Sequence, residues 1–136
     1  SFPRQDAIKQ VFGDGSREIV VFSDSNCTYC AQMERLFEKV SNLTIYTFVT
    51  PMLRGKENES EVVCAKNPAE VWHAWMSGRK SLPPVPAGCD DSVLDRNLAL
   101  AADLGVNSAP TMFFKSGNMV RGAIPEDVLE RHLRGN

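Results

Sequence analysis

The sequence predicts an α/β domain, and three observations carry that prediction. A β-branched and aromatic run at 18–23 is followed by helical periodicity, and strand-like residues return at 44–49. A Cys-x-x-Cys pair, Cys27 and Cys30, stands where the first strand gives way to the helix. A hairpin pattern and a last helix follow near the C-terminus. With 136 residues the chain can bury a hydrophobic core as a single domain, 1–136.

The N-terminal segment and the first strand are separated by a turn signal. Residues 5–12 predict a short amphipathic helix or linker that ends at the glycine-rich turn 13–15. The run 18–23 lacks alternation, which is typical of a central strand covered on both faces. We therefore expect an N-terminal linker or helix over 1–17, followed by the core strand.

A helix should begin at the first cysteine of the motif. Apolar residues recur after it at helical spacing and predict one buried face: Tyr29, Met33, Leu36, Phe37 and Val40. The strand 44–49 then closes a strand, helix, strand unit. Its two strands should be parallel, with a right-handed crossover.

The middle of the chain, about 51–90, predicts an insertion between two halves of the fold. A polar stretch at 54–61 indicates a solvated loop, and a helix follows at 70–76. Three prolines between 83 and 86 exclude regular helix and favour an extended path toward Cys89.

The last third of the chain predicts two helices around a hairpin. Ser92 and Asp95 form a capping-box pattern for a helix that ends at Gly105, and a hairpin pattern covers 111–121. Pro125 opens the final helix. The complete order, with Cys-x-x-Cys at the start of the first long helix, is that of the thioredoxin fold: a central mixed sheet flanked by helices, with a helical insertion between the βαβ and ββα halves.

The position of the cysteine pair predicts its chemistry. Disulfide exchange needs a thiolate, and a free cysteine with a pKa of about 8.5 is mostly protonated near neutrality. Unpaired backbone N–H groups and the positive end of the helix dipole favour the anion at Cys27. Cys30 lies one turn further into the helix and should be more buried. We predict that Cys27 carries the mixed disulfide and that Cys30 resolves it.

A zinc site is an alternative reading of the same motif, because Cys-x-x-Cys also occurs as a metal knuckle. Cys64 and Cys89, however, are separated by 24 residues and make no second knuckle. The strand-to-helix setting is the one that redox motifs use. We therefore expect no metal and no cofactor, and keep a zinc protein or a non-catalytic thioredoxin-like binding module as the less favoured hypotheses.

Composition limits the partners and the compartment. A net charge of −2 without a long basic cluster gives no footprint for nucleic acid, and no apolar stretch reaches the roughly 18 residues of a membrane span. Four cysteines, two of them remote from the motif, favour an oxidising, extracytoplasmic compartment. Residues 1–4 lack a signal-peptide pattern; a mature or trimmed chain would begin in this way.

Several segments together resemble the catalytic domain of the DsbC/DsbG group of periplasmic disulfide isomerases, over roughly 5–133. These segments are 21–24 leading into the Cys-x-x-Cys motif, the pair Cys64 and Cys89, the stretch 104–110 and the hairpin 115–122. The resemblance implies a periplasmic thiol–disulfide oxidoreductase or isomerase that acts on exported proteins with cysteines, together with a redox partner that resets the dithiol. A monomeric thiol oxidase or reductase of the same fold is the alternative.

The resemblance also implies roles for residues outside the dithiol. Pro110 matches a cis-proline that faces the active cysteines, beside the Ala109 backbone where substrate pairs. Thr28 and Tyr29, between the cysteines, complete the expected substrate-binding set. A further implication is a structural disulfide between the other two cysteines, Cys64 and Cys89, with two buried free thiols as the alternative.

Three positions depart from the patterns of related proteins. Thr28 stands where relatives often carry Gly or Pro, and Ala109 stands where Thr is common; both affect redox potential and substrate choice. Val21 replaces the buried aspartate of thioredoxins proper, which favours an isomerase or oxidase over a cytosolic reductase. Family isomerases carry an N-terminal dimerisation domain, so a homodimer would form through a region absent from these residues.

Overall fold

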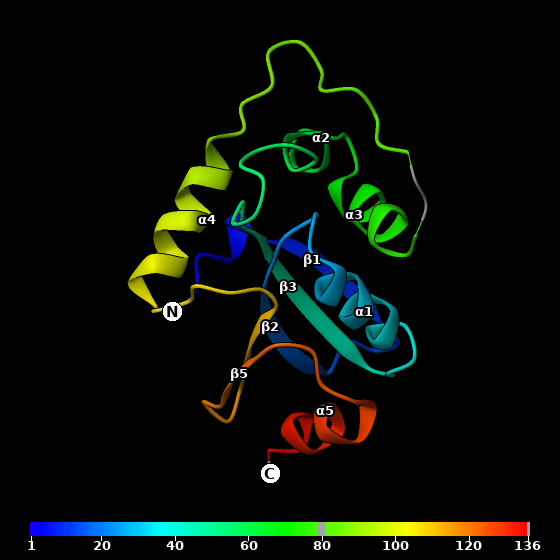
Figure 1. Ribbon diagram of the computed structural model, residues 1–136. Coiled ribbons are helices and arrows are strands. Elements are labelled where there is room, and N and C mark those ends of the chain that lie inside the picture. Colours follow the sequence, from blue (N-terminus) through cyan, green and yellow to red (C-terminus); the bar gives the residue numbers. More distant parts are fainter. Residues whose placement is uncertain (79–80, 136) are drawn as a thin grey trace.

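A five-stranded mixed sheet forms the centre of the computed structural model, which describes residues 1–78 and 81–135 (Figure 1). The strands in chain order are β1 (Ile8–Phe12), β2 (Arg17–Ser23), β3 (Leu43–Val49), β4 (Thr111–Phe114) and β5 (Met119–Arg121). Their order in the sheet is β1-β3-β2-β4-β5. β2 and β3 are parallel, and the other neighbouring pairs are antiparallel. Residues 79 and 80, within the expected insertion, lie outside the described residues.

Helices cover both faces of the sheet. They are the 3-10 helix η1 (Arg4–Asp6) and the α-helices α1 (Thr28–Phe37), α2 (Ser60–Val63), α3 (Pro68–Met76), α4 (Ser92–Asp103) and α5 (Glu126–Leu133). Figure 1 shows α1 and α4 on opposite sides of the sheet, with α2 and α3 at one end. In the described part of the chain, no helix has the length and apolar character needed to cross a bilayer. The predicted thioredoxin fold with a helical insertion is confirmed.

The alternating side chains of β2 explain why its sequence is apolar throughout. Ile19 and Val21 pack with residues of α1 and α5, including Met33 and Leu129. Val20, Phe22 and their neighbours pack on the opposite face, toward α4. A strand that is buried on both faces has no solvent side on which polar residues would be favoured. This strand leads directly into the loop that carries the dithiol.

The helix or linker predicted at 5–12 is wrong, because most of this segment is β1, paired antiparallel with β3. Its side chains alternate between buried and exposed, but the polarity of the residues hides the pattern. Gln10 points inward and its amide donates to Glu34 at 2.7 Å, whereas Val11 is exposed. In a half-buried strand the inward positions are usually apolar and the outward ones polar. Here the order is reversed, because the inward amide of Gln10 has a buried hydrogen-bond partner.

Three further local expectations are corrected. The solvated loop 54–61 includes the buried Glu59 and the start of α2. The capping box is absent: Asp91 is the N-cap of α4 without a side-chain bond, and the Asp95 carboxylate accepts from Lys56 at 3.0 Å instead. Tyr29 is 64% exposed and does not join the buried face of α1.

Candidate active site

Cys27 stands at the junction between β2 and α1, as the N-cap residue of the helix. Its Sγ accepts a hydrogen bond from the backbone N–H of Cys30 at 3.2 Å. An N-cap side chain that accepts such a bond satisfies one of the free N–H groups of the first turn. Cys27 and Cys30 are both free thiols in this structure. The sulfur of Cys27 therefore sits where the helix itself supplies donors for an anion.

The surroundings of Cys27 lower the pKa of its thiol from 9.0 to about 7. The largest cause is the hydrogen bond from the Cys30 thiol, and the backbone N–H groups of Cys30 and Tyr29 act in the same direction. Burial and the charge of Asp24 oppose them. Near neutral pH, Cys27 therefore has a larger thiolate fraction than a free cysteine, and the thiolate is the form that attacks disulfides.

Cys30 lies deeper than Cys27 and has the opposite electrostatics. Its exposed fraction is 2%, against 7% for Cys27. Burial raises the pKa of the Cys30 thiol, and its hydrogen bond to Cys27 raises it further. The proton is therefore held on Cys30 while Cys27 ionises.

The strand register brings the Ala109–Pro110 segment to the dithiol. Phe22, at the end of β2, pairs with Thr111 at the start of β4, so the residues before Thr111 lie beside the loop that follows β2. The Cys27 thiol lies 3.5 Å from the carbonyl oxygen of Ala109, to which it donates. The Ala109–Pro110 peptide bond is cis.

The two residues between the cysteines lie at the same end of the molecule. Thr28 and Tyr29 are exposed, whereas Pro110 is buried and Ala109 is half-buried. The carbonyl oxygen of Pro110 accepts from the N–H of Gly122 at 2.8 Å, which fixes the segment to the end of β5. The structure thus brings the expected substrate-binding positions around one sulfur.

Two buried carboxyl groups, those of Asp24 and Glu59, accept hydrogen bonds that hold the active-site loop in place. Asp24 accepts the backbone N–H groups of Met52 and Leu53 at 2.8 and 2.9 Å. Glu59 accepts the N–H of Ser25 at 3.0 Å. Burial raises the pKa of Glu59 to about 9, and the neighbouring Asp24 contributes to this shift. Glu59 is therefore a neutral acid at physiological pH, held beside the ionisable dithiol loop.

Sequence reasoning missed both Glu59 and Asp24 as parts of the site. Asp24 is fully buried and accepts a hydrogen bond from the chain after β3. Glu59 lies in a polar stretch with Glu57 and Glu61, and no local pattern distinguishes it from them. Its burial depends on contacts with a loop more than thirty positions away.

Cys64 and Cys89 are joined by a disulfide across a sequence separation of 25. The bond links the end of α2 to the segment before α4 and closes the loop that contains α3. Within the described residues, no group of three or more His, Cys, Asp or Glu side chains could hold a metal ion. The second cysteine pair therefore belongs to the insertion and not to the dithiol.

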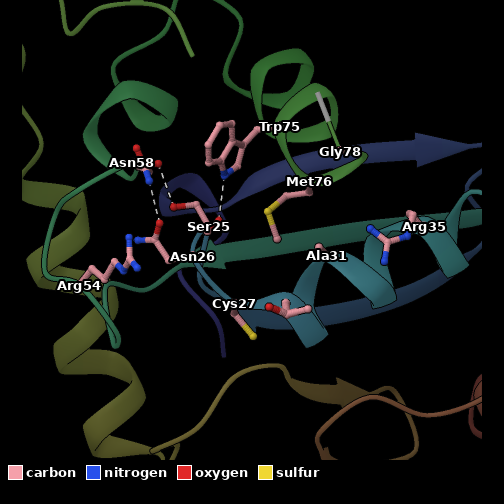
Figure 2. A pocket seen from close by; sticks show the side chains of 11 residues that line it. Ser25, Asn26, Cys27, Ala31, Arg35, Arg54, Asn58, Trp75, Met76 and Gly78 are labelled. Atoms are coloured by element: carbon pink, nitrogen blue, oxygen red, sulfur yellow. Dashed lines mark hydrogen bonds between the residues drawn. The ribbon is translucent and has the colours of Figure 1, made fainter. Parts of the chain in front are cut away.

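A groove of about 480 Å³ opens beside Cys27, between α1, α3 and the loop after β3 (Figure 2). The loop residues on its wall are bonded to one another: Asn58 donates to the Asn26 side chain at 2.8 Å, and the Ser25 hydroxyl donates to the Asn58 carbonyl at 2.8 Å. The indole N–H of Trp75, on α3, donates to the carbonyl oxygen of Ser25 at 2.8 Å. The groove is thus built from the same loop that positions Cys27.

Comparison with known proteins gives consistent matches over nearly all of the chain. The family of thioredoxin-like domains matches residues 4–135. A protein of Bordetella pertussis named "Probable thiol:disulfide interchange protein DsbC" is 47% identical over 129 residues, which are 93% of this chain and 45% of that protein. The chain spans about half the length of the curated relatives it matches.

Solved structures agree with the sequence matches. A disulfide interchange protein from Neisseria gonorrhoeae is 31% identical, with a TM-score of 0.89, and the match covers 99% of this chain and 98% of that one. A periplasmic thioredoxin-like protein from Salmonella enterica serovar Typhimurium has a TM-score of 0.74 at 21% identity, covering 98% and 91% of the two chains. The second likeness is one of fold.

Proposed function

The chain belongs to the thioredoxin-like family that includes the DsbC disulfide interchange proteins, and from this premise we propose that it exchanges disulfides in exported proteins through a mixed disulfide at Cys27. The observation that carries the proposal is the Cys27 thiol, with a pKa of about 7 at the helix N-terminus above the buried, protonated Cys30. A thiol whose pKa lies near ambient pH combines a large thiolate fraction with good nucleophilicity.

The first step is attack of the Cys27 thiolate on one sulfur of a substrate disulfide. The bond from Cys27 to that sulfur forms as the substrate S–S bond breaks, and the released substrate thiolate takes a proton from water. The N–H groups that stabilise the Cys27 anion also make it a good leaving group in the reverse direction. The mixed disulfide can therefore be resolved by either of two thiols.

Isomerisation uses a thiolate of the substrate itself. It attacks the substrate sulfur of the mixed disulfide, a new substrate disulfide forms, and Cys27 leaves as thiolate with no net oxidation. Reduction uses Cys30, which loses its proton to water and attacks the Cys27 sulfur. The Cys27–Cys30 disulfide forms as the bond from Cys27 to the substrate sulfur breaks, and the substrate leaves as a second thiolate that takes a proton from water. The substrate has then gained two electrons, and an external dithiol protein must reduce the Cys27–Cys30 pair again.

The raised pKa of Cys30 favours the isomerase branch. Because Cys30 must lose a strongly held proton before it attacks, the mixed disulfide persists long enough for substrate thiols to compete. We assign substrate docking to the exposed Thr28 and Tyr29 and to the Ala109–Pro110 segment, whose carbonyl faces Cys27. The Cys64–Cys89 disulfide supports an oxidising, periplasmic setting for this chemistry.

The test is to trap the intermediate. Cys30→Ala removes the resolving thiol, so the reduced variant should accumulate an adduct with a disulfide-containing peptide, and mass spectrometry should place it on Cys27. Cys27→Ala is the matched control and should form no adduct. An adduct on Cys30 in that control, or none in Cys30→Ala, would refute the assignment of the nucleophile.

A further inference from the structure

We propose that the groove beside Cys27 binds the substrate segment next to the reactive cysteine and prefers a segment that carries an acidic side chain. This inference rests on the proposed function and names the substrate class that the site takes. The groove volume, about 480 Å³, is within the range of ligand sites in proteins. Its lining includes Cys27 itself, so an occupant is continuous with the residue that forms the mixed disulfide.

The charges in the groove are all of one sign. Its eleven lining residues include Arg35 and Arg54 and no acidic residue, in a protein whose net charge is −2. The two arginines lie at opposite ends of the groove, with Cys27 between them (Figure 2). Guanidinium groups bind carboxylates through paired hydrogen bonds, so a peptide carboxylate is the complementary partner.

Both arginines are available to a ligand. In the part of the chain that the structure describes, no carboxylate lies within ion-pair distance of Arg35. Among the described residues, Arg54 forms an ion pair only with Glu57, at 3.5 Å, and both side chains are more than 60% exposed. An exposed pair three residues apart contributes little, so a substrate carboxylate can replace Glu57.

The helix sets the distance between the reactive cysteine and the acidic residue. Thr28, Ala31 and Arg35 line one face of α1 at i, i+3 and i+7 and form one side of the groove. Arg35 is eight positions after Cys27, a rise of about 12 Å along the helix, which an extended peptide covers in roughly three to four residues. A carboxylate about three positions from the substrate cysteine is therefore placed to reach Arg35.

The groove is pre-formed because its walls are bonded to the active-site loop. Trp75 holds α3 to Ser25, and Asn58 holds the opposite loop to Asn26. Ser25 and Asn26 are two and one positions before Cys27, so these bonds fix the walls of the groove relative to Cys27. Binding of a substrate segment therefore costs little conformational entropy in the protein, because the groove is already ordered.

The experiment measures how fast reduced protein forms the mixed disulfide with matched peptide disulfides that carry Asp, Asn or Lys three residues from the cysteine. The rate with neutral 2-hydroxyethyl disulfide normalises each variant. The expected result is that Asp is preferred over Lys by about fivefold in the native chain, the size of an exposed ion pair, and that added salt lowers the preference. Arg35→Glu and Arg54→Glu should each lower the Asp-to-Lys ratio, and Arg35→Gln should lower it less than Arg35→Glu.

Arg131→Glu is the control, because it changes the net charge equally at an exposed side chain of α5, a helix that does not line the groove. It should keep the native ratio. Equal rates for Asp and Lys peptides in the native chain, or an equal loss of preference in Arg131→Glu, would overturn the groove as the recognition site. Failure of the native chain to react even with 2-hydroxyethyl disulfide would instead overturn the proposed function.

Discussion

The side chain of Glu59 accepts the backbone N–H of Ser25 at 3.0 Å, two residues before Cys27. Glu59 is fully buried, and burial raises its pKa to about 9. The acid therefore stays protonated in the folded protein at pH values where it ionises in the unfolded chain. This difference links the stability of the whole domain to a residue behind the active-site loop.

We predict that the free energy of unfolding contains a contribution from Glu59 that decreases from about pH 4.5 to about pH 9. In this range the unfolded chain has released the proton and the folded chain still binds it, so raising the pH favours unfolding. Glu59→Gln mimics the protonated acid and should remove this contribution. Denaturant unfolding at several pH values, for native and variant chains, measures the difference.

Glu61→Gln is the control for that comparison, because Glu61 lies two positions further along, in the short helix that Glu59 caps, but is only half-buried. It should leave the pH dependence as in the native chain. Parallel pH profiles for the native chain and Glu59→Gln would show that Glu59 ionises normally and would contradict the predicted coupling.

The Cys64–Cys89 disulfide should stabilise the domain without taking part in exchange. Replacing both cysteines with Ala should lower the free energy of unfolding by about 3 kcal/mol, the chain-entropy value for a loop of this length. Denaturant unfolding measures the loss. The pKa of Cys27 should be unchanged, so a shifted alkylation profile in the double variant would contradict a purely structural role.

The Trp75 indole should contribute to the free energy of unfolding through its hydrogen bond as well as through its apolar surface. Its N–H donates to the Ser25 carbonyl at 2.8 Å, and Trp75→Phe would leave that carbonyl without this donor. The expected cost is about 1 kcal/mol, the net contribution of one hydrogen bond, because this contact is only partly buried. Denaturant unfolding measures this cost.

Trp75→Phe should also weaken the binding of peptides in the groove. Val71→Ala is the control on the same helix: it loses apolar contact but no donor, and should keep the native peptide affinity.

The parts of the fold that could be predicted from the sequence are those in which buried positions are apolar and exposed positions are polar. The strand predicted at 18–23 was found because both its faces are apolar, and the dithiol was found because its spacing and its place before a helix are local features. β1 was missed because Gln10 is buried and Val11 is exposed. There the inward position is stabilised by a hydrogen bond to Glu34, a partner 24 positions away that no local pattern reveals.

The missing parts of the site depend on contacts between distant segments. Glu59 becomes a neutral buried acid only when the loop after β3 folds against Asp24 and Ser25. Likewise, Arg35 and Arg54 share a groove only because α1 and that loop meet beside Cys27. Residue type and spacing identify the reactive sulfur, but the electrostatic environment requires the tertiary structure.

The reactivity of Cys27 should follow a titration with a midpoint at about pH 7, and Cys30 should set that midpoint. The largest stabilisation of the Cys27 thiolate comes from the Cys30 thiol, so Cys30→Ala should raise the pKa of Cys27 toward its ordinary value. The shift should be partial, because the backbone N–H groups of residues 29 and 30 stay in place. Alkylation rates with iodoacetamide from pH 5 to pH 9 measure both profiles.

Below the new midpoint the variant should react more slowly than the native chain, since less thiolate is present, while the two rates converge well above it. Cys30→Ser is the informative companion, because its hydroxyl can donate to Cys27 and should recover part of the lowered pKa. A native midpoint at the free-cysteine value of about 8.5 would contradict the site geometry. Identical midpoints in the native chain and Cys30→Ala would instead show that the helix N-terminus alone stabilises the anion, and the Cys30 thiol would then serve only as the resolving group.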